Sequence, residues 1–324
     1  MSVGWVLIFA LSAGAMVGAG TLVADAGRQI AIRTRLGQVV VGALLLGFVT
    51  SLPEMVTNAS AALANQPSLA IGSVFGSCMA NMAILAVLDL LHRGRLLESV
   101  QLRQARLAAV AMLLTAVAVL GIVQPSGITI GWIGVYPLAL VGLYVLTLRW
   151  LRSGTTAPDV APALQSERSL VVPVAKFAIG AVALLVAAPI AVHAATRFAD
   201  AAGISKGFVG VALVALATSL PELFTSLAAL RLGAYDLAVG NLLGSNSFNI
   251  ASILVADAFF TKGAILNSIG NVDVIAGLVA IVLMAIAAAA IVGDPNEERR
   301  GLDPGPLLLL GAYGIGIVIV GTAS

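Results

Sequence analysis

Two short polar segments of this sequence lie in apolar surroundings, and each carries one glutamate. They read Thr50-Ser51-Leu52-Pro53-Glu54 and Thr218-Ser219-Leu220-Pro221-Glu222. Each is followed by a second polar segment, with Ser77 and Asn81 in the first copy and Ser245 and Asn249 in the second. Carboxylate, hydroxyl and amide oxygens are the ligands that hard cations such as Ca²⁺ and Na⁺ prefer. These residue types therefore indicate cation binding.

The two copies keep a constant spacing of 168 residues, from Thr50 to Thr218 and from Asn81 to Asn249. A repeat that stays in register over this many polar positions indicates a duplicated structural unit. Within each copy the Ser–Asn pair has the i, i+4 spacing that places both side chains on one face of a helix.

The composition places these segments in a membrane. Hydrophobic residues make up 60% of the 324 positions and charged residues only 10%, and the mean hydropathy is +1.07. Apolar runs of about 20 residues, long enough to cross the hydrocarbon core as helices, recur along the chain. We predict an all-α integral membrane protein with ten transmembrane helices, at about 3–24, 37–64, 68–91, 104–122, 128–150, 170–196, 206–230, 235–259, 271–293 and 305–322.

Charge and cysteine content exclude other classes of protein. The formal charge of +2 gives no indication of nucleic-acid binding. The one cysteine, Cys78, allows neither an internal disulfide nor a Cys-rich metal site. The sequence has no Gly-x-x-x-x-Gly-Lys-Ser/Thr motif, which disfavours ATP-driven pumping. The first apolar stretch lacks a basic leader and a cleavage site, so we expect it to be retained as a helix.

The ten helices divide into two halves of five. The first half covers residues 1–150 and the second covers 170–324, with a short linker at 151–169 that contains Ser, Gly, Thr and Pro. Because five is odd, the second half enters the membrane from the opposite side, and the repeat is inverted. Inverted repeats whose helices are interrupted near the midplane are typical of secondary transporters.

The basic residues favour one orientation of this topology. If both termini lie outside, all but three of the 17 Lys and Arg residues fall in or beside cytoplasmic loops, as the positive-inside rule requires. The three exceptions are Arg197, Lys206 and Lys262. We therefore expect a multi-pass protein of the cell membrane with extracellular or periplasmic termini and a cytoplasmic 151–169 linker.

Glu54 and Glu222 are expected near mid-depth in helices 2 and 7. A charged side chain at that depth costs roughly 3 kcal/mol or more unless it is paired, protonated or bound to an ion. A protonated glutamate hydrogen-bonded between helices would explain one such residue. Two of them at matched positions of an inverted repeat, with no Lys or Arg nearby in the spans, favour a shared ion site.

Pro53 and Pro221 predict that helices 2 and 7 are interrupted at the glutamate segments. Proline lacks an N–H and clashes with the carbonyl four residues earlier, so backbone oxygens around 47–50 and 215–218 would be free. We expect helices 3 and 8 to be interrupted in the same way, at Gly76-Ser77 and Gly244-Ser245. A simple packing kink is the alternative, but it does not explain why hydroxyls and a carboxylate occur at both kinks.

The charge of the predicted site sets what it can carry. Two glutamates bring −2, which one Ca²⁺, two monovalent ions or two protons would neutralise, whereas an uncompensated buried charge is prohibitive. Alternative occupancy of one site is the physical basis of obligatory exchange. Alternating access then opens the site to one side of the membrane at a time.

At these residues the sequence resembles the calcium/cation antiporter superfamily, which includes sodium/calcium and calcium/proton exchangers. The resemblance covers the whole length and rests on two alpha-repeats, at about 42–91 and 210–259, and on the paired Thr-Ser-Leu-Pro-Glu segments. It implies that Glu54 and Glu222 share the divalent cation, with hydroxyl or carbonyl oxygens from Thr50 and Thr218. It also implies that six further residues complete flanking sodium sites or line the permeation path: Ser51, Ser77, Asn81, Ser219, Ser245 and Asn249.

Several positions depart from the pattern of that superfamily. The glycine that commonly precedes the Thr-Ser pair is Val49 in the first repeat and Ala217 in the second, and Ser73 replaces the asparagine seen at Asn241. Some members carry Asp where this chain has Asn81 or Asn249. These departures bear on the choice and number of ions more than on the class.

We predict a secondary active antiporter that exchanges Ca²⁺ against Na⁺, with no enzymatic activity and no cofactor. Its expected partners are the lipid bilayer and small inorganic cations, with no nucleic acid and no obligate protein partner. Coupling to H⁺ is the main alternative, because the glutamates could release protons as a divalent cation binds, but protons need no hydroxyl ligands. A cation channel or a membrane receptor is less favoured, since the inverted duplication supplies one carboxylate per half. Asp89 and Asp257, also 168 residues apart, are expected as solvated helix ends or at the mouths of the ion path.

Overall fold

The computed structural model describes residues 2–92, 95–152, 169–201, 217–293 and 304–323, and nearly all of them are helical. Each of the ten predicted spans contains a described helix. In chain order the elements are α1 (Ser2–Thr34), α2 (Gln38–Val41) with the π-helical turn η1 (Gly42–Leu46) and α3 (Gly47–Leu63), α4 (Pro67–Leu91), η2 (Leu97–Ser99), α5 (Arg103–Val123), β1 (Thr129–Ile130), β2 (Ile133–Gly134), α6 (Val135–Arg152), α7 (Val171–Ala201), α9 (Leu220–Arg231), α10 (Tyr235–Ala251), α11 (Ile253–Phe259), η4 (Ile265–Ser268), α12 (Asn271–Val292) and α13 (Pro304–Ala323).

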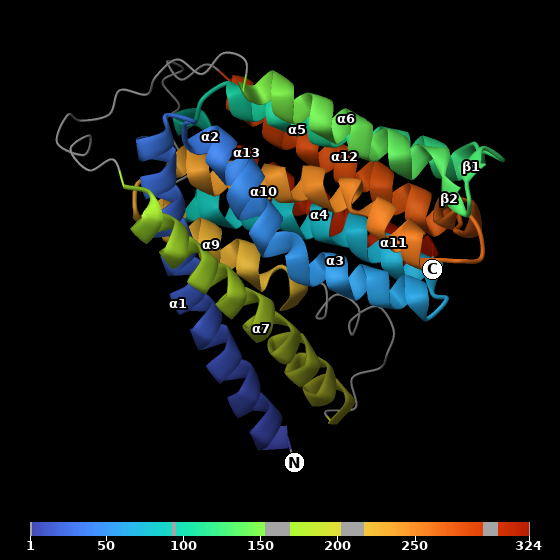
Figure 1. The fold of residues 1–324 in the computed structure, drawn as a ribbon, viewed down its shortest axis with the longest axis horizontal. Helices are drawn as coiled ribbons and strands as arrows, with labels where there is room; N and C mark the ends of the chain where they lie inside the picture. The colour runs from blue at the N-terminus through green and yellow to red at the C-terminus, as the bar shows by residue number, and fades with distance from the viewer. Residues whose placement is uncertain (1, 93–94, 153–168, 202–216, 294–303, 324) are drawn as a thin grey trace.

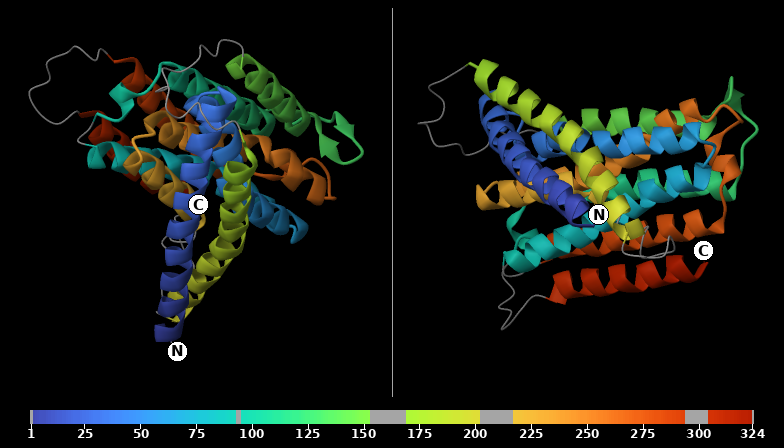
Figure 2. Two further views of the ribbon diagram at one scale, coloured as in Figure 1. Left: turned by 60° about the vertical axis from the view of Figure 1, so that its left-hand side comes forward. Right: turned by 90° about the horizontal axis from the view of Figure 1, so that it is seen from below.

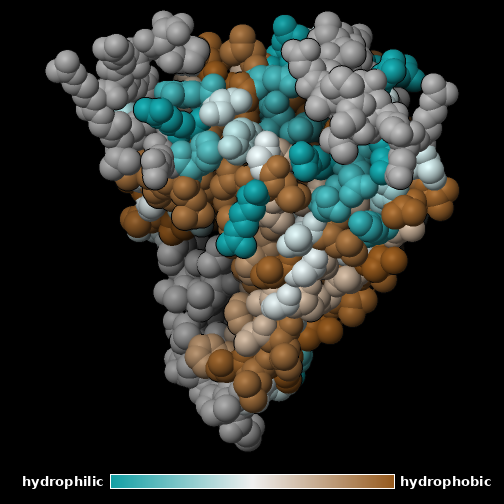
Figure 3. Space-filling model, turned by 90° about the vertical axis from the view of Figure 1, so that its left-hand side faces the viewer, coloured by the Kyte–Doolittle hydropathy of each residue, from teal (hydrophilic) through white to brown (hydrophobic). Residues whose placement is uncertain are grey.

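Eight of the described helical segments are long and apolar enough to cross a membrane, and Val135–Trp150 of α6 is a shorter apolar segment. Large apolar side chains are exposed on their outer faces, among them Leu11 at 75%, Ile179 at 64% and Ile315 at 63%. Figure 3 shows hydrophobic residues over the lower part of one side of the molecule and hydrophilic ones gathered in its upper part. This surface suits a lipid environment, and the chain is a multi-pass membrane protein.

The first helices of the two halves, α1 and α7, lie against each other. Figures 1 and 2 show this pair at a steep angle to the remaining helices and extending beyond them. Asp25 of α1 and Lys176 of α7 form an ion pair at 3.8 Å. Helix α1 continues to Thr34, ten residues past the predicted end of the span, and passes through Gly27 without a break; the backbone leaves the helix at Arg35 and Gly37, which have φ values of 59° and 80°.

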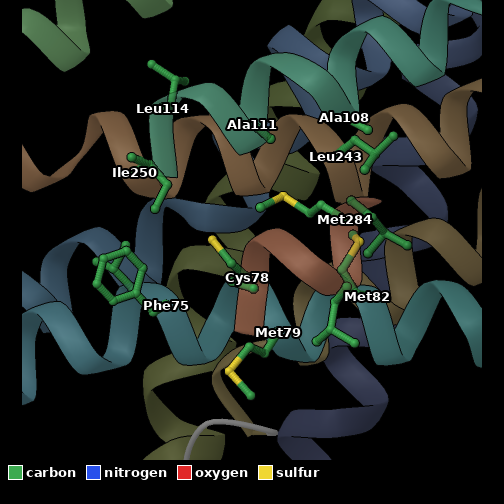
Figure 4. Close-up of a cluster of buried hydrophobic side chains, with 14 of the residues drawn as sticks. Phe75, Cys78, Met79, Met82, Ala108, Ala111, Leu114, Leu243, Ile250 and Met284 are labelled. Atoms are coloured by element: carbon green, nitrogen blue, oxygen red, sulfur yellow. The ribbon is translucent and has the colours of Figure 1, made fainter. Parts of the chain in front are cut away.

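The main apolar core forms between α4, α5, α10 and α12. Phe75, Met79 and Met82 of α4 pack there with side chains from the other three helices, including Leu114, Leu243 and Met284 (Figure 4). Cys78 is fully buried in the same cluster. This core holds α4 and α10, the carriers of the second polar segments, in fixed positions.

The predicted interruptions of helices 2 and 7 are present, but the first lies elsewhere. In helix 2 the backbone is helical through Thr50–Glu54, and the irregular turn is η1, where the Gly47 N–H bonds to the Gly42 carbonyl five residues earlier. In helix 7 the break falls at Ser219, just before α9. A helix accommodates Pro53 because only the Val49 carbonyl loses its usual donor. Residues 202–216, and with them the predicted start of helix 7, lie outside the described residues.

The predicted break at Gly76-Ser77 is wrong, because α4 is one continuous helix from Pro67 to Leu91. Helix 8 does break, but at Ser252, between α10 and α11, and not at Gly244-Ser245. A glycine followed by serine weakens a helix by only about 1 kcal/mol, which the packing of α4 and α10 in the core easily offsets. Helix 5 also begins later than predicted, because a short hairpin precedes it with β1 antiparallel to β2.

Asp89 and Asp257 are not solvated helix ends, since both are fully buried. Oδ1 of Asp89 accepts a hydrogen bond from the Leu96 N–H at 2.7 Å. Asp257 accepts bonds from the Ile265 N–H at 2.6 Å and from the Gly134 N–H at 2.7 Å. The repeated aspartate therefore has a structural role, because in each half it binds the loop that follows its helix.

Replacing Asp257 by alanine is expected to destabilise the fold. The change leaves two buried N–H groups without acceptors, at a combined cost of about 3 kcal/mol. The only cysteine is buried, so the rate at which a thiol-reactive fluorophore labels Cys78 during heating reports unfolding. We expect a clearly lower Tm for Asp257→Ala and a nearly unchanged Tm for Asp25→Ala, whose ion pair is partly exposed. Equal Tm values for wild type and Asp257→Ala would refute this role.

Candidate functional site

The two glutamate segments meet in the middle of the protein through a reciprocal pair of hydrogen bonds. Ser51 Oγ donates to Glu222 Oε1 at 3.0 Å, and Ser219 Oγ donates to Glu54 Oε1 at 3.3 Å. Ser219 and Glu222 follow Ser51 and Glu54 by 168 residues, so each bond is the counterpart of the other. The structure thus shows the pseudo-two-fold relation between the repeats at their polar centre, as an inverted duplication requires.

Both carboxylates are buried, with Glu54 1% and Glu222 0% exposed. They are close enough to repel each other, and Glu54 also interacts with Ser77, while Glu222 interacts with Thr50. Among the described residues neither carboxylate forms an ion pair with Lys, Arg or His. The Oε2 atom of each glutamate has no hydrogen-bond partner. Two buried carboxyl groups, each with an unpartnered oxygen, are a strong attractor for a cation once both are ionised.

Thr50 connects the first repeat to α10. Its Oγ1 donates to the Leu46 carbonyl at 3.0 Å and lies 3.2 Å from both Asn241 Oδ1 and Ser245 Oγ. Ser245 Oγ also donates to the Gly47 carbonyl at 3.3 Å. Hydroxyl, amide and backbone oxygens from two helices therefore converge beside the glutamate pair.

Small residues allow this convergence. A Cβ built on Gly47 would lie 2.7 Å from the Ser245 nitrogen, and one built on Gly244 would lie 2.5 Å from the Ala43 carbonyl oxygen. Contacts this short exclude any side chain, so η1 and α10 touch backbone to backbone. The glycine in the Gly244-Ser245 segment therefore brings helices together and does not interrupt its own helix.

A second cross-repeat contact joins α4 and α10. Asn81 Nδ2 donates to Asn246 Oδ1 at 2.9 Å, and Asn246 Nδ2 donates to the Cys78 carbonyl at 3.3 Å. Asn246 occupies the position 168 residues after Cys78, so these equivalent positions meet on the pseudo-two-fold axis. Asn249 lies one helical turn after Asn246 on α10 and is 1% exposed. Neither its amide oxygen nor its amide nitrogen has a hydrogen-bond partner.

The structure buries all ten predicted site residues, including Thr218 at 4% exposure. It brings Thr50, Ser51, Ser77, Ser219 and Ser245 to the glutamate pair or to each other. Asn241 and Asn246 also belong to this network, although neither is among the predicted site residues. Asn246 could not be found from the repeat, because its counterpart is a cysteine. Asn241 could have been found, because its counterpart in the first repeat is Ser73 and this difference is visible in the sequence.

The described residues contain no group of three or more His, Cys, Asp and Glu side chains that could hold a metal ion. The negative charge at the polar centre therefore comes from two glutamates, and the remaining ligands it can offer are neutral oxygens. This composition fits reversible binding of hard cations better than a tight transition-metal site. The fold and its polar centre together are those of a membrane transporter built from two inverted repeats.

Comparison with known proteins agrees with this class. A model of the family described as sodium/calcium exchanger protein matches residues 4–151 and 172–321. The chain is 30% identical over 232 residues to an uncharacterized membrane protein of Methanocaldococcus jannaschii, covering 72% of this chain and 74% of the relative. It is 32% identical over 233 residues to the inner membrane protein YrbG of Escherichia coli, covering 70% of each.

A solved structure extends the similarity to nearly the whole fold. The sodium-calcium exchanger NCX_Mj, soaked with 10 mM Na⁺ and zero Ca²⁺, matches with a TM-score of 0.76 at 26% identity, covering 98% of this chain and 99% of that chain. The protein belongs to the sodium/calcium exchanger family. Its two halves are the two repeats of a cation antiporter of that type.

Proposed function

We propose that this protein exchanges Ca²⁺ for Na⁺ by alternating access at the glutamate pair. The observation that carries the proposal is the reciprocal bonding of Ser51 to Glu222 and of Ser219 to Glu54. It joins one carboxylate from each repeat in a single buried site, so that a bound cation links the two halves. The similarity to the sodium-calcium exchanger NCX_Mj supports the choice of ions.

In this proposal Glu54 and Glu222 bind Ca²⁺ through their unpartnered Oε2 atoms. Thr50 and Thr218 add hydroxyl or carbonyl oxygens, so that the six to eight oxygens that Ca²⁺ prefers can be reached. Ser51, Ser77, Ser219 and Ser245 then serve Na⁺ ions that replace Ca²⁺, because a smaller charge needs fewer carboxylates. Asn81 and Asn249 line the path beside them.

Coupling follows from charge compensation. Two buried carboxylates without a cation would cost several kcal/mol each, so the empty site should not reorient across the membrane. Either one Ca²⁺ or two monovalent cations neutralise the pair, and each loaded form is free to reorient. Exchange then proceeds only when each side supplies a cation.

The distribution of basic residues supports extracellular or periplasmic termini in the cell membrane, with the 151–169 linker in the cytoplasm. Access of a C-terminal tag to an antibody from outside the cytoplasmic membrane tests this orientation.

Transport by the purified protein in liposomes tests the function. We expect ⁴⁵Ca²⁺ uptake when Na⁺ is loaded inside and diluted outside, and little uptake when a pH gradient is imposed without Na⁺. Liposomes with the double variant Glu54→Gln/Glu222→Gln control for leakage. Uptake driven only by the pH gradient would show proton coupling, and the absence of any gradient-coupled cation flux would contradict an antiporter.

A further inference from the structure

Asn58 lies on α3 one helical turn beyond Glu54, and it is only 2% exposed. Neither its amide oxygen nor its amide nitrogen has a hydrogen-bond partner, and the same is true of Glu54 Oε2. The i, i+4 spacing places the two side chains on one face of the helix. Buried polar groups are nearly always hydrogen-bonded, so two neighbouring unsatisfied groups at a transport site require an explanation.

In the second repeat, the two residues equivalent to Asn58 and Ser73 are hydrogen-bonded to each other. Ser226 follows Asn58 by 168 residues, and Asn241 follows Ser73 by the same interval. There the Asn241 amide nitrogen donates to Ser226 Oγ at 2.9 Å, while its amide oxygen lies 3.2 Å from Thr50 Oγ1. The first repeat has the same two residue types in the opposite order, with the asparagine on α3 and the serine on α4. No hydrogen bond joins Asn58 to Ser73.

The pairing of helices places Asn58 and Ser73 at one level. Helices α3 and α4 are antiparallel neighbours joined by a short turn after Leu63, and Glu54 interacts with Ser77 between them. Asn58 lies four residues after Glu54 on α3, and Ser73 lies four residues before Ser77 on α4, so the antiparallel pairing places them at about the same level. Ser73 is partly exposed. One side of the glutamate pair therefore offers a carboxylate oxygen, an amide oxygen and a hydroxyl oxygen from two helices.

We propose that Glu54, Asn58 and Ser73 form a sodium subsite one helical turn from the glutamate pair. The inference rests on the proposed exchange function and adds to it a cation position on one side of the pair only. A single carboxylate oxygen with neutral oxygens compensates one positive charge, whereas a divalent ion prefers six to eight oxygens and more negative charge. On the other side, both ends of the Asn241 amide are already hydrogen-bonded, so the unsatisfied amide occurs on the Asn58 side of the pair.

Thermal stability distinguishes a cation ligand from a packing residue. Asn58→Leu replaces the amide with an apolar side chain of similar volume and removes two unsatisfied buried atoms, so without Na⁺ its Tm should equal or exceed that of the wild type. Na⁺ that binds the folded protein raises Tm by mass action. We expect Asn58→Leu to need about tenfold more Na⁺ than the wild type for the same rise, which corresponds to ~1.4 kcal/mol.

Two further variants test the direction of this change in the Na⁺ concentration required. Asn58→Asp keeps the shape and adds a charge, and it is expected to lower the Na⁺ concentration required for the same rise in Tm. Ser60→Ala is the matched control on the same helix, because Ser60 is exposed and its hydroxyl donates to the Val56 carbonyl one turn earlier. Its Na⁺ dependence should match the wild type.

Transport separates the subsite from the Ca²⁺ site. For Asn58→Leu we expect the half-saturating Na⁺ concentration of Na⁺-driven ⁴⁵Ca²⁺ uptake to rise about tenfold, while Ca²⁺/Ca²⁺ exchange without Na⁺ stays within about twofold of the wild type. Unchanged Na⁺ dependence would overturn the subsite and leave the exchange function standing. A parallel loss of both modes would assign Asn58 a structural role and overturn the subsite as well.

A different result would contradict the proposed exchange function. Wild-type liposomes without Na⁺-coupled uptake would contradict Na⁺/Ca²⁺ exchange itself. In that case a Na⁺-induced rise in Tm that disappears in Asn58→Leu would still support the subsite, and a wild-type Tm that does not respond to Na⁺ would overturn it.

Discussion

Either Glu54→Gln or Glu222→Gln alone is expected to abolish Na⁺-driven Ca²⁺ uptake. The two buried carboxylates face each other without a basic partner among the described residues, so both charges are needed to compensate a divalent cation. Removing one partner from a buried charge cluster costs about 3–5 kcal/mol, and 3 kcal/mol is about a 100-fold loss of affinity. Initial rates of ⁴⁵Ca²⁺ uptake into liposomes measure the effect.

Glutamine keeps the shape of the site, because its amide oxygen can still accept the hydrogen bond from Ser219 or Ser51. The variants should therefore fold, and their Tm without cations should equal or exceed that of the wild type, since a repulsion between two buried carboxylates is gone. Asp25→Asn is the control, a carboxylate removed from α1 at a partly exposed ion pair with Lys176. Normal uptake by both glutamine variants would show that the cation binds elsewhere.

Much of this site could be predicted from the sequence because it is repeated. The constant spacing between Glu54 and Glu222 identifies two half-sites, and the odd number of helices in each half makes them meet in the membrane. The reciprocal bonds with Ser51 and Ser219 follow from that symmetry. A duplicated sequence thus predicts contacts between residues that are far apart in the chain.

The sequence was a poorer guide where tertiary packing decides the local structure. Gly76-Ser77 was expected to break helix 3, but α4 is continuous because Phe75, Cys78 and Met82 anchor it in the core (Figure 4). The 168-residue spacing identifies Asp89 and Asp257 as a repeated pair, but their structural role depends on loop amides that only the fold brings near. Local propensity is a weak guide wherever burial supplies a larger free energy.

Positions that break the symmetry were hardest to interpret. Asn246 and Cys78 are equivalent in the repeat but differ in chemistry, so the pattern of shared residues hides their contact on the pseudo-two-fold axis. Asn58 and Ser73 exchange the residue types of Ser226 and Asn241. Such exchanges are visible in the sequence, but only the hydrogen bonds show that one pair is saturated and the other is not.

Gly244→Ala is expected to disrupt both the fold and transport. The new Cβ would contact the Ala43 backbone and lie 2.5 Å from its carbonyl oxygen, so η1 and α10 must separate. Overpacking in a core commonly costs about 1–3 kcal/mol, and here the clash is with backbone, which cannot rotate away. Separation would also pull Thr50 from Ser245 and Asn241, which now lie 3.2 Å from its hydroxyl. We expect a lower Tm by Cys78 labelling and little Na⁺-driven uptake.

Gly142→Ala on α6 is the matched control, because no described atom lies within 4 Å of a Cβ built there. Its Tm should be unchanged or slightly higher, since alanine favours a helix over glycine by about 1 kcal/mol. Substituting Ala43 by glycine should not rescue Gly244→Ala, because the nearest atoms belong to the backbone and remain in place. Wild-type stability and uptake in Gly244→Ala would mean that η1 and α10 have room to move apart without loss, and that their close contact does not position the oxygens around Thr50.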